Sequence, residues 1–412
     1  MKCLVVSEYY LPTMGGHTVW LHEICKRFED ARVITRLLEG TARRETIEGV
    51  DVERIKLGRI WYCRPESLPM YANLLWTTAR IARRNRSVPI LAARVLPEGL
   101  VANASARIAG SASVIFAHGE EVKRWGGMDS YNDRRRCTAA LKRITLWRVY
   151  RGASMVIANT AFTKDLLTGG GVDRSRICVI HPGTDPRRFR PMRRDGELVA
   201  RFGLAEARTI LTIGRLVCRK GQDMVIRAMP HVLKRVPDAV YVIGGEGAYG
   251  TVLRDLARKA GVESHVRFIG KVDEEVLPSI YNLADVFVMP NRVPPDSGDV
   301  EGFGIVFLEA NACGVPVIGG NTGGVPEAIV QEKTGLLVDG TSVQSIADNI
   351  VRILTNPALA RRLGQDGRKR VCEELTWDHS AAKVKELLEE TDRSRHSGRR
   401  ERESVLAKRE RV

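Results

Sequence analysis

Two glutamates stand eight residues apart in the segment from Asp299 to Ile318. Between Glu301 and Glu309, a glycine-containing turn leads into an apolar run that predicts a helix, and a short β-branched run then predicts a buried strand. Free N–H groups at a helix N-terminus favour a diphosphate, and flanking carboxylates favour hydroxyls. A nucleotide-sugar carries hydroxyls at both ends and a diphosphate between them, so the segment could hold one along its length. The alternative is an acidic loop before a helix with a surface glutamate.

A second candidate for phosphate chemistry follows the predicted strand 209–213. Arg215 and Lys220 bracket a loop that runs from Gly214 to Gly221, ahead of a predicted helix. Two cations at the carboxyl end of a strand could neutralise a leaving diphosphate, and arginine could bind it bidentately. The alternative is a solvated basic loop.

A histidine stands in a comparable place in the first half of the chain. His118 directly follows the predicted strand 113–117 and precedes Gly119. This position favours a role in a ligand cleft, and the alternative is a hydrogen-bonded histidine at the domain surface. The remaining histidines are dispersed and indicate no metal site.

The spacing Gly245-x-Gly247-x-x-Gly250 matches the dinucleotide fingerprint and raises the alternative of an NAD-dependent oxidoreductase. The match begins late in the chain, and the first strand has only Gly15 and Gly16 after it. We therefore interpret residues 244–250 as a tight turn with close backbone packing.

The elements that position these residues alternate between strand and helix, which predicts parallel sheets covered by helices on both faces. A segment rich in proline and glycine at 181–191 divides two such series and predicts an interdomain linker. We expect an α/β protein of two doubly wound, Rossmann-like domains at 1–186 and 187–375, a terminal helix at 376–391 and a disordered basic tail at 392–412. Strands are predicted at 3–7, 32–36, 50–55, 89–93, 113–117 and 155–158, then at 209–213, 239–243, 266–269, 286–289, 315–318 and 335–338.

Composition narrows the class of protein. The 412 residues carry a formal net charge of +16, which predicts anionic partners. No apolar run approaches the roughly 20 residues that span a bilayer, and the first residues do not resemble a signal peptide. The eight cysteines form no Cys-x-x-Cys pair. We expect a reduced, cytoplasmic protein without a zinc site or disulfide framework.

Two basic segments predict helices that could contact an anionic membrane. Residues 133–151 combine arginines and lysines with an apolar stripe that includes Leu141, Ile144 and Trp147, and residues 71–84 are similar. The alternative is that each helix packs its stripe on the sheet and solvates its charges. Nucleic acid is not an expected partner, because no reader motif is present.

Taken together, the chain to about residue 390 resembles the family-4 glycosyltransferases, which are retaining enzymes of the GT-B fold. The resemblance rests on four features in order: Gly15-Gly16 after the first strand, the Gly-Arg-Leu…Lys-Gly segment at 214–221, the pair Glu301 and Glu309, and the following Ala-Cys-Gly-Val-Pro-Val run. The amino-acid sequence around 299–318 and 221–230 is similar to that of mannosyltransferases acting on phosphatidylinositol mannosides.

The resemblance implies a role for each matching position. Gly15 and Gly16 would approach the distal phosphate, and Arg215 and Lys220 would hold the diphosphate. Glu301 would bind sugar hydroxyls and Glu309 the ribose. The remaining implied site residues are His118 against the sugar, the backbone N–H groups around Phe303, Gly304 and Ile305, and base contacts from Gly270, Lys271 and Val272.

The family also implies retention of anomeric configuration without a covalent enzyme nucleophile, a metal or another cofactor, and a terminal helix that crosses back to pack on the N-terminal domain. We therefore expect an enzyme that moves a hexose, mannose from GDP-mannose by preference, to a lipid-linked or glycan acceptor, in the cytoplasm or peripherally on the inner membrane face. The alternatives are a transferase that uses UDP-glucose or a UDP-N-acetylhexosamine, and a catalytically silent nucleotide-sugar-binding protein.

Overall fold

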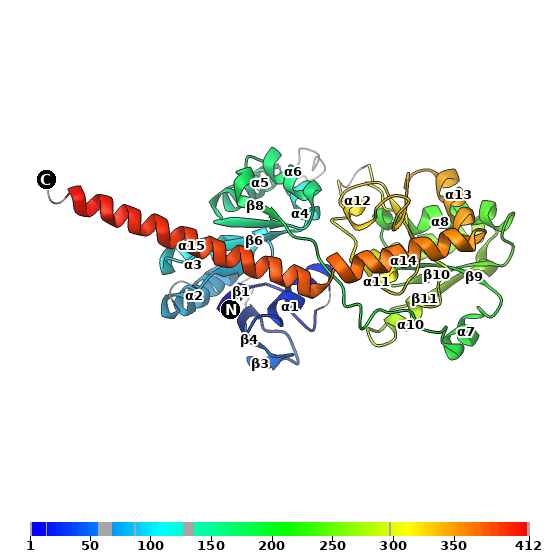
Figure 1. Ribbon diagram of the computed structural model, residues 1–412, viewed down its shortest axis with the longest axis horizontal. Coiled ribbons are helices and arrows are strands. Elements are labelled where there is room, and N and C mark those ends of the chain that lie inside the picture. Colours follow the sequence, from blue (N-terminus) through cyan, green and yellow to red (C-terminus); the bar gives the residue numbers. More distant parts are fainter. Residues whose placement is uncertain are drawn as a thin grey trace. The chain divides into compact units, whose positions relative to one another are not determined.

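A computed structural model describes residues 2–13, 15–56, 68–85, 88–126, 136–295 and 298–409. These residues divide into two units (Figure 1). The first unit comprises the described residues up to 126 together with 136–180 and 377–409, and the second comprises 181–376. The boundary after Ile180 falls where the linker at 181–191 begins, six residues before the predicted domain boundary.

The described residues of the first unit contain an eight-stranded sheet in the order β3-β4-β2-β1-β5-β6-β7-β8. Its strand pairs are parallel except for β3, an edge strand that runs antiparallel to β4. This departure from the predicted parallel sheet has a local cause, because Glu48 and Gly49 both adopt positive φ and close a two-residue hairpin. The strands are β1 (Lys2–Val6), β2 (Asp30–Arg36), β3 (Arg44–Ile47), β4 (Val50–Ile55), β5 (Ile90–Ala92), β6 (Ser113–Ala117), β7 (Met155–Ala158) and β8 (Ile177–Val179).

Helices cover the first sheet, and buried aliphatic side chains fill the space between them and the strands. One core cluster joins alternate residues of the central strands, such as Val6, Ala92 and Ile115, to helices α2, α3 and α5. The helices of this unit are α1 (Gly16–Cys25), α2 (Leu68–Arg84), a π-helical turn η1 (Val95–Gly99), α3 (Leu100–Ala109), α4 (Glu120–Gly126), α5 (Arg136–Gly152), α6 (Ala161–Gly169), the 3₁₀ turn η2 (Arg174–Arg176) and α15 (Trp377–Arg409).

The second unit contains a six-stranded sheet in the order β11-β10-β9-β12-β13-β14, parallel throughout. The six strands coincide with the predicted ones to within two residues at either end. They are β9 (Arg208–Ile213), β10 (Ala239–Gly244), β11 (Val266–Gly270), β12 (Val286–Met289), β13 (Val317–Gly320) and β14 (Gly335–Val338).

Both faces of this sheet are buried, and the strand period of two sorts the side chains between them. Ile210, Val286 and Val288 enter a cluster with α8, α9 and α13, whereas Leu211 and Phe287 enter a second cluster with α10 and α11. The helices are α7 (Gly196–Phe202), η3 (Cys218–Lys220), α8 (Gln222–Leu233), α9 (Gly250–Lys259), η4 (Glu263–His265), α10 (Leu277–Tyr281), α11 (Ile305–Ala312), α12 (Val325–Ala328), α13 (Val343–Leu354) and α14 (Pro357–Glu374).

The last helix belongs to the first unit, although the chain enters it from the second. Trp20 of α1 donates from its indole nitrogen to the Ser380 hydroxyl of α15 at 3.0 Å, and Arg27 pairs with Asp378 at 2.5 Å. Beyond residue 391, where the sequence predicts a disordered tail, α15 continues to Arg409 (Figure 1). The tail is rich in Arg and Glu, residues of high helix propensity, and the prediction considered its charge and its few apolar residues.

Within the described part of the chain, we find no helix with the length and apolar character needed to cross a bilayer.

Candidate functional site

The second sheet reverses its winding direction between β9 and β12. From β9 the chain adds β10 and β11 on one side, then places β12, β13 and β14 on the other. In open α/β sheets, ligands bind outside the carboxyl ends of the strands at such a reversal. Two loops leave the sheet there: the β9 loop, residues 214–221, and the β12 loop, residues 290–304. A ligand site is therefore expected between these two loops.

Glu301 of the β12 loop is contacted from both loops. Lys220 Nζ lies 2.7 Å from Glu301 Oε2, Asn291 Nδ2 donates to the same oxygen at 3.2 Å, and the Arg219 guanidinium also contacts it. Arg219 Nε lies 3.1 Å from Asp299 Oδ2. The structure thus brings together Lys220 and Glu301, as the sequence suggests, and adds three residues that sequence reasoning missed.

The charged groups of this cluster are buried, and their pKa values are shifted from the ordinary values. Burial raises the pKa of the Glu301 carboxyl, but Lys220 and Arg219 outweigh it and lower that pKa to about 2. Burial lowers the pKa of Lys220; Glu301 opposes this effect, while the charges of Arg219 and Arg215 add to it. Burial is the main cause of the shift of Lys220, and the two adjacent cations are the cause of the shift of Glu301. An anionic group bound here, such as a diphosphate, would favour the charged form of the buried Lys220.

Arg215 does not join the buried cluster. Its side chain is exposed, and its carbonyl oxygen accepts from Gln222 Nε2 at 3.1 Å. The buried arginine is Arg219, whose side chain is only 5% exposed. Sequence reasoning chose Arg215 because it opens the loop, although Arg219 adjoins Lys220 in the same motif. Adjacency to Lys220 was the available signal.

Glu309 lies on α11 and faces a different set of groups. The Tyr281 hydroxyl of α10 donates to Glu309 Oε2 at 2.6 Å. Burial raises the pKa of Glu309 to about 7, Tyr281 opposes this shift and the charge of Glu274 reinforces it. The carboxyl therefore changes charge near neutral pH, which suits a group that accepts hydrogen bonds from hydroxyls when ionised.

The turn before α11 is shaped by a glycine. Gly304 has φ +94°, and a Cβ there would lie 2.7 Å from the Phe307 ring. Phe303 is buried beside it and stacks on His181 with ring centroids 5.3 Å apart. Because the first amides of an α-helix have no intrahelical acceptor, Ile305 presents an N–H at the start of α11. The predicted backbone donors thus stand at the carboxyl side of β12.

The predicted base-contacting residues, Gly270 to Val272, begin at the last residue of β11, two strands away from β9. No contact joins them to Glu301 in the described residues. Between these strands, a Cβ on Gly245 would lie 2.1 Å from the Gly214 carbonyl oxygen, and one on Gly247 would lie 2.4 Å from that of Leu216. The interpretation of 244–250 as close backbone packing is confirmed, because these glycines let the loop after β10 pack on the β9 loop.

In the first unit, Gly15 and Gly16 stand at the start of α1, directly outside the carboxyl end of β1. Gly15 is the residue before the helix, and its carbonyl accepts from Val19 N at 2.9 Å. The amide groups of this first turn are therefore oriented along the start of a helix, as a phosphate contact requires.

His118 follows β6 in the same sheet and is largely enclosed. Its Nε2 lies 2.7 Å from the Ala93 carbonyl oxygen, and the rings of Trp20 and His17 flank it edge-on at centroid distances of 5.6 and 5.9 Å. Burial lowers the pKa of His118 to about 4, partly opposed by the bond to Ala93, so the imidazole is neutral at pH 7. A carbonyl only accepts, so Nε2 carries the hydrogen and Nδ1 is an acceptor.

A second polar network, which carries no sequence motif and was not predicted, lies near His118. Arg94, which follows β5, is 3.4 Å from Glu8 after β1 and 3.3 Å from the fully buried Glu98. Tyr150 donates to Glu121 after β6 at 2.9 Å, and burial raises the pKa of Glu121 to about 7. These groups share the carboxyl edge of the first sheet.

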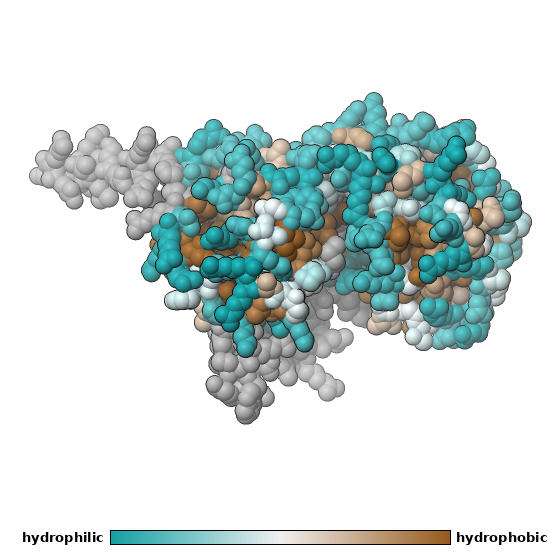
Figure 2. All heavy atoms as spheres, turned by 90° about the horizontal axis from the view of Figure 1, so that it is seen from below, coloured by the Kyte–Doolittle hydropathy of each residue, from teal (hydrophilic) through white to brown (hydrophobic). Residues whose placement is uncertain are grey.

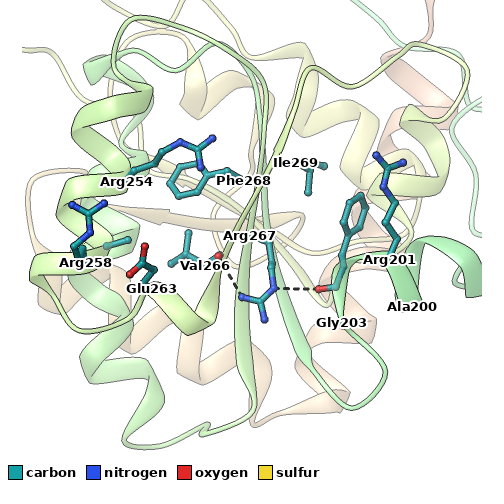
Figure 3. A pocket seen from close by; sticks show the side chains of 12 residues that line it. Ala200, Arg201, Gly203, Arg254, Arg258, Glu263, Val266, Arg267, Phe268 and Ile269 are labelled. Carbon is teal, nitrogen blue, oxygen red and sulfur yellow. Dashed lines mark hydrogen bonds between the residues drawn. The ribbon is translucent and has the colours of Figure 1, made fainter.

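A pocket of about 710 Å³ lies elsewhere, along the edge strand β11 (Figure 3). Figure 3 shows Arg254 over the Phe268 ring and the Arg267 guanidinium directed to a backbone oxygen beside Gly203, which is that of Phe202. Among the predicted site residues, none lines this pocket. We therefore place the candidate site at the β9 and β12 loops.

The chain matches two family models. "Glycosyl transferases group 1" matches residues 199–370, and "Glycosyltransferase Family 4" matches residues 14–188. A GDP-mannose-dependent alpha-(1-6)-phosphatidylinositol monomannoside mannosyltransferase of Mycobacterium tuberculosis is 40% identical over 292 residues, which cover 70% of this chain and 73% of the relative. A GDP-mannose-dependent monoacylated alpha-(1-6)-phosphatidylinositol monomannoside mannosyltransferase of Corynebacterium glutamicum is 28% identical over 395 residues, or 95% and 99% of the two chains.

Solved structures share the fold at low identity. Sucrose-phosphate synthase from Thermosynechococcus elongatus matches with a TM-score of 0.78 and 23% identity, covering 94% of this chain and 98% of that one. Anabaena HepE, solved in complex with UDP and glucose, matches with a TM-score of 0.76 and 20% identity over 94% and 99% of the two chains. The two parallel-sheet units thus have the predicted GT-B fold, and the chain belongs to the family-4 glycosyltransferases, which transfer a sugar from a nucleotide-sugar.

Proposed function

We propose that this protein is a retaining mannosyltransferase that moves mannose from GDP-mannose to a hydroxyl of a lipid-linked acceptor of the phosphatidylinositol mannoside class. The observation that carries the proposal is the buried cluster of Lys220, Arg219 and Glu301 at the reversal point of the second sheet. The choice of donor and acceptor is supported by the activities for which the mycobacterial and corynebacterial relatives are named.

In this proposal the cationic cluster stabilises the departing diphosphate. Lys220 exchanges part of its contact with Glu301 for a phosphate oxygen, and the exposed Arg215 closes on the diphosphate from the rim of the β9 loop. Because the pKa of Lys220 is lowered by burial and by neighbouring cations, an incoming anion stabilises its charged form. Cations in a desolvated site act most strongly on charge that develops in the transition state. No metal is needed, and turnover should persist in excess EDTA.

Glu301 and Glu309 bind hydroxyls of different parts of the donor: Glu301 binds the sugar and Glu309 binds the ribose. The contacts to Glu301 from Lys220, Arg219 and Asn291 all meet Oε2, so Oε1 is the oxygen offered to sugar hydroxyls. Glu309 accepts from the ribose, and the amide groups around Phe303 to Ile305 assist at the sugar. We propose His118 Nδ1 as a further acceptor of hydrogen bonds from sugar hydroxyls.

The acceptor hydroxyl attacks the anomeric carbon from the face that the diphosphate leaves. Its proton passes to a phosphate oxygen of the departing GDP, while the bond from the anomeric carbon to the phosphate oxygen breaks. The new glycosidic bond keeps the donor's configuration, and no enzyme nucleophile is involved. Nuclear magnetic resonance of the product's anomeric proton tests retention directly.

The donor is tested by calorimetry and thermal shift with GDP, GDP-mannose, UDP, UDP-glucose, a UDP-N-acetylhexosamine and NAD. Stabilisation by GDP and GDP-mannose, followed by GDP release when phosphatidylinositol monomannoside is added, supports the proposal. Stabilisation by UDP compounds alone would overturn the donor, and nucleotide binding without turnover on any lipid or glycan acceptor would favour a silent binding protein.

We also propose that the first unit contacts an anionic membrane through α2 and α5. Trp76 on α2 is 62% exposed and its ring is covered by Arg80 at 4.8 Å, while Leu141 on α5 is 65% exposed, with Ile144 one turn on at 51%. The predicted alternative, in which the apolar stripe packs on the sheet, does not account for these two α5 residues. Residues 133–135 of the predicted basic helix lie outside the described part of the chain.

The face seen in Figure 2 is not broadly apolar. Figure 2 shows hydrophilic residues over most of the visible face, with hydrophobic ones in smaller areas between them. Flotation with vesicles of phosphatidylglycerol and phosphatidylcholine tests the contact. The variant Trp76→Ala with Leu141→Ser should lose binding at low salt, whereas Val252→Ser, an exposed apolar residue of the second unit, should retain it. Equal flotation of both variants would contradict this proposal.

A further inference from the structure

We propose that Arg292 is a positioning residue for sugar transfer: it fastens the β12 loop to the β9 loop and thereby holds Lys220 and Arg219 against Glu301. The inference rests on the proposed function, because it concerns the accuracy of the same cationic site. Arg292 lies in the β12 loop, outside the segment that carries the family motifs, and it contacts neither Glu301 nor Lys220 in the described contacts.

The side chain of Arg292 reaches into the β9 side of the site. Its Nη2 lies 2.9 and 2.8 Å from the two oxygens of Asp223 and 3.2 Å from Cys218 Sγ. Both partners are enclosed, since the Asp223 side chain is 6% exposed and that of Arg292 is 12% exposed. Asp223 stands in the first turn of α8, where a negative charge is favoured by the helix dipole. Such a desolvated pair fixes geometry far better than an exposed one.

The backbone of Arg292 makes a second connection. Its N–H donates to the carbonyl oxygen of Arg219 at 3.0 Å. Arg219 in turn sends its side chain back to the β12 loop, where it meets Asp299 and Glu301. The two loops are therefore joined by two arginines. Arg292 of the β12 loop pairs with Asp223, which follows the β9 loop, and Arg219 of the β9 loop pairs with Asp299 and Glu301 of the β12 loop.

The loops also touch where no side chain could fit. Gly221 ends the β9 loop with φ +76°, and a Cβ there would lie 2.3 Å from the Pro290 carbonyl oxygen. The turn from Cys218 to Lys220 is thus held on both sides, by Gly221 against Pro290 and by Arg292 on Cys218 and Arg219. The last residue of this turn is Lys220, whose Nζ lies within hydrogen-bond distance of Glu301.

The ion pair is tested with Arg292→Lys, which keeps the charge, and Arg292→Gln, which does not. We expect kcat/KM for GDP-mannose to fall roughly ten- to a hundredfold in both, mostly in kcat, because small misplacements of catalytic groups have effects of this size. The charge-reversed pair Arg292→Asp with Asp223→Arg should recover part of the loss found in Arg292→Asp alone. The matched control is Arg352→Gln, which breaks an exposed Arg–Glu pair with Glu332 in the same unit, at 2.6 and 2.9 Å.

A pH profile separates positioning from a loss of folding. Glu301 is surrounded by Lys220 and Arg219 of the β9 loop, Asn291 and Asp299 of the β12 loop, and the nearby charge of Arg215. If the cations are loosened, the acid limb of kcat/KM should move to higher pH by about one pH unit. Arg352→Gln should leave the acid limb in place.

The outcomes are distinct. Wild-type protein that binds no GDP would refute the proposed function itself, whatever the variants do. Active wild-type protein with Arg292→Gln within threefold of it and an unmoved acid limb, measured at a temperature where both are folded, would overturn the positioning role alone. A kcat loss with a moved acid limb and partial rescue by the reversed pair would establish it.

Discussion

Removing Lys220 and removing Glu301 should lower stability by unequal amounts, although they are the two partners of one ion pair. Glu301 retains Arg219 and Asn291 when Lys220 is replaced by methionine, so no charge is left uncompensated. Removing one partner from a buried pair costs about 3–5 kcal/mol when the other charge is left uncompensated, and less when, as for Glu301, other partners remain. Glu301→Gln removes the carboxylate that Lys220 contacts, whereas Arg219 keeps its pair with Asp299.

The magnitude follows from the pKa of Glu301. Lowering that pKa from 4.5 to about 2 corresponds to about 3 kcal/mol of net stabilisation of the carboxylate, which Glu301→Gln would forfeit. We therefore expect the free energy of unfolding at pH 7 to fall by about 3–5 kcal/mol in Glu301→Gln and by less than about 2 kcal/mol in Lys220→Met. Turnover should fall at least about a hundredfold in both, because each removes a charged group from the reacting centre.

Urea unfolding measured by circular dichroism gives the stability, and GDP release from GDP-mannose with lipid acceptor gives the turnover. Lys26→Met is the matched control, since Lys26 Nζ lies 2.8 Å from Glu48 in a more exposed pair of the first unit. It should change stability by less than about 1 kcal/mol and leave turnover intact. Equal destabilisation by Lys220→Met and Glu301→Gln would refute the idea that Arg219 and Asn291 compensate Glu301 when Lys220 is lost.

The pH dependence of Glu301 has a defined sign. Its folded pKa is lowered, so its contribution to stability is present above about pH 4.5 and is lost as the pH falls towards 2. In Lys220→Met the folded pKa should lie closer to 4.5, and adding Glu301→Gln to that variant should cost less stability than adding it to the wild-type protein. Unfolding between pH 3 and 7 measures this change.

Three further predictions concern other parts of the site. The pKa of Glu309 is raised in the folded protein, so its contribution to stability is present below about pH 4.5 and is lost as the pH rises through about 7. The affinity for GDP-mannose, measured by calorimetry, should instead rise by up to about tenfold between pH 6 and 8, because the carboxylate forms in this range. Glu309→Gln should abolish that rise. His118→Phe should keep the ring packing but lower kcat by about tenfold or more with little change in GDP affinity, and an unchanged kcat would remove His118 from the site. Gly323→Ala places a Cβ 2.4 Å from the Glu301 carbonyl oxygen at φ +60° and should lower the melting temperature by several degrees in calorimetry, while Gly261→Ala, equally at positive φ but in open space, should cost less.

Parts of this molecule could be predicted because their signals are local. The β-branched runs of the second unit define six strands, and the fixed rule for ligands at strand carboxyl ends leads to the loops that hold Lys220 and Glu301. The fold class follows from the same alternation. The hairpin strand β3 was missed because its pattern is polar on both faces, and its pairing depends on two residues with positive φ.

The partners of the site could not be predicted in the same way. Asn291 contributes an amide to Glu301 from ten residues away, and nothing in its neighbourhood distinguishes it from a loop asparagine. The choice between Arg215 and Arg219 depends on which side chain the 3₁₀ turn at Cys218–Lys220 directs inward; adjacency to Lys220 favours Arg219, and packing determines the outcome. Glu8 and Arg94 meet across 86 residues of chain. Ion pairs between residues far apart in the chain produce no periodic pattern in the amino-acid sequence.

The return of the chain to its first unit has a consequence for how the protein is made. Trp20 is buried, and its indole nitrogen is satisfied by Ser380, which the ribosome supplies 360 residues later. The second unit, 181–376, is contiguous and has all of its strands by residue 338. Although domains usually fold in the order of synthesis, here the later-made unit can complete its core while the earlier one still waits for its closing helix. Pulse proteolysis of stalled nascent chains should find 181–376 protected before residues 2–180 are.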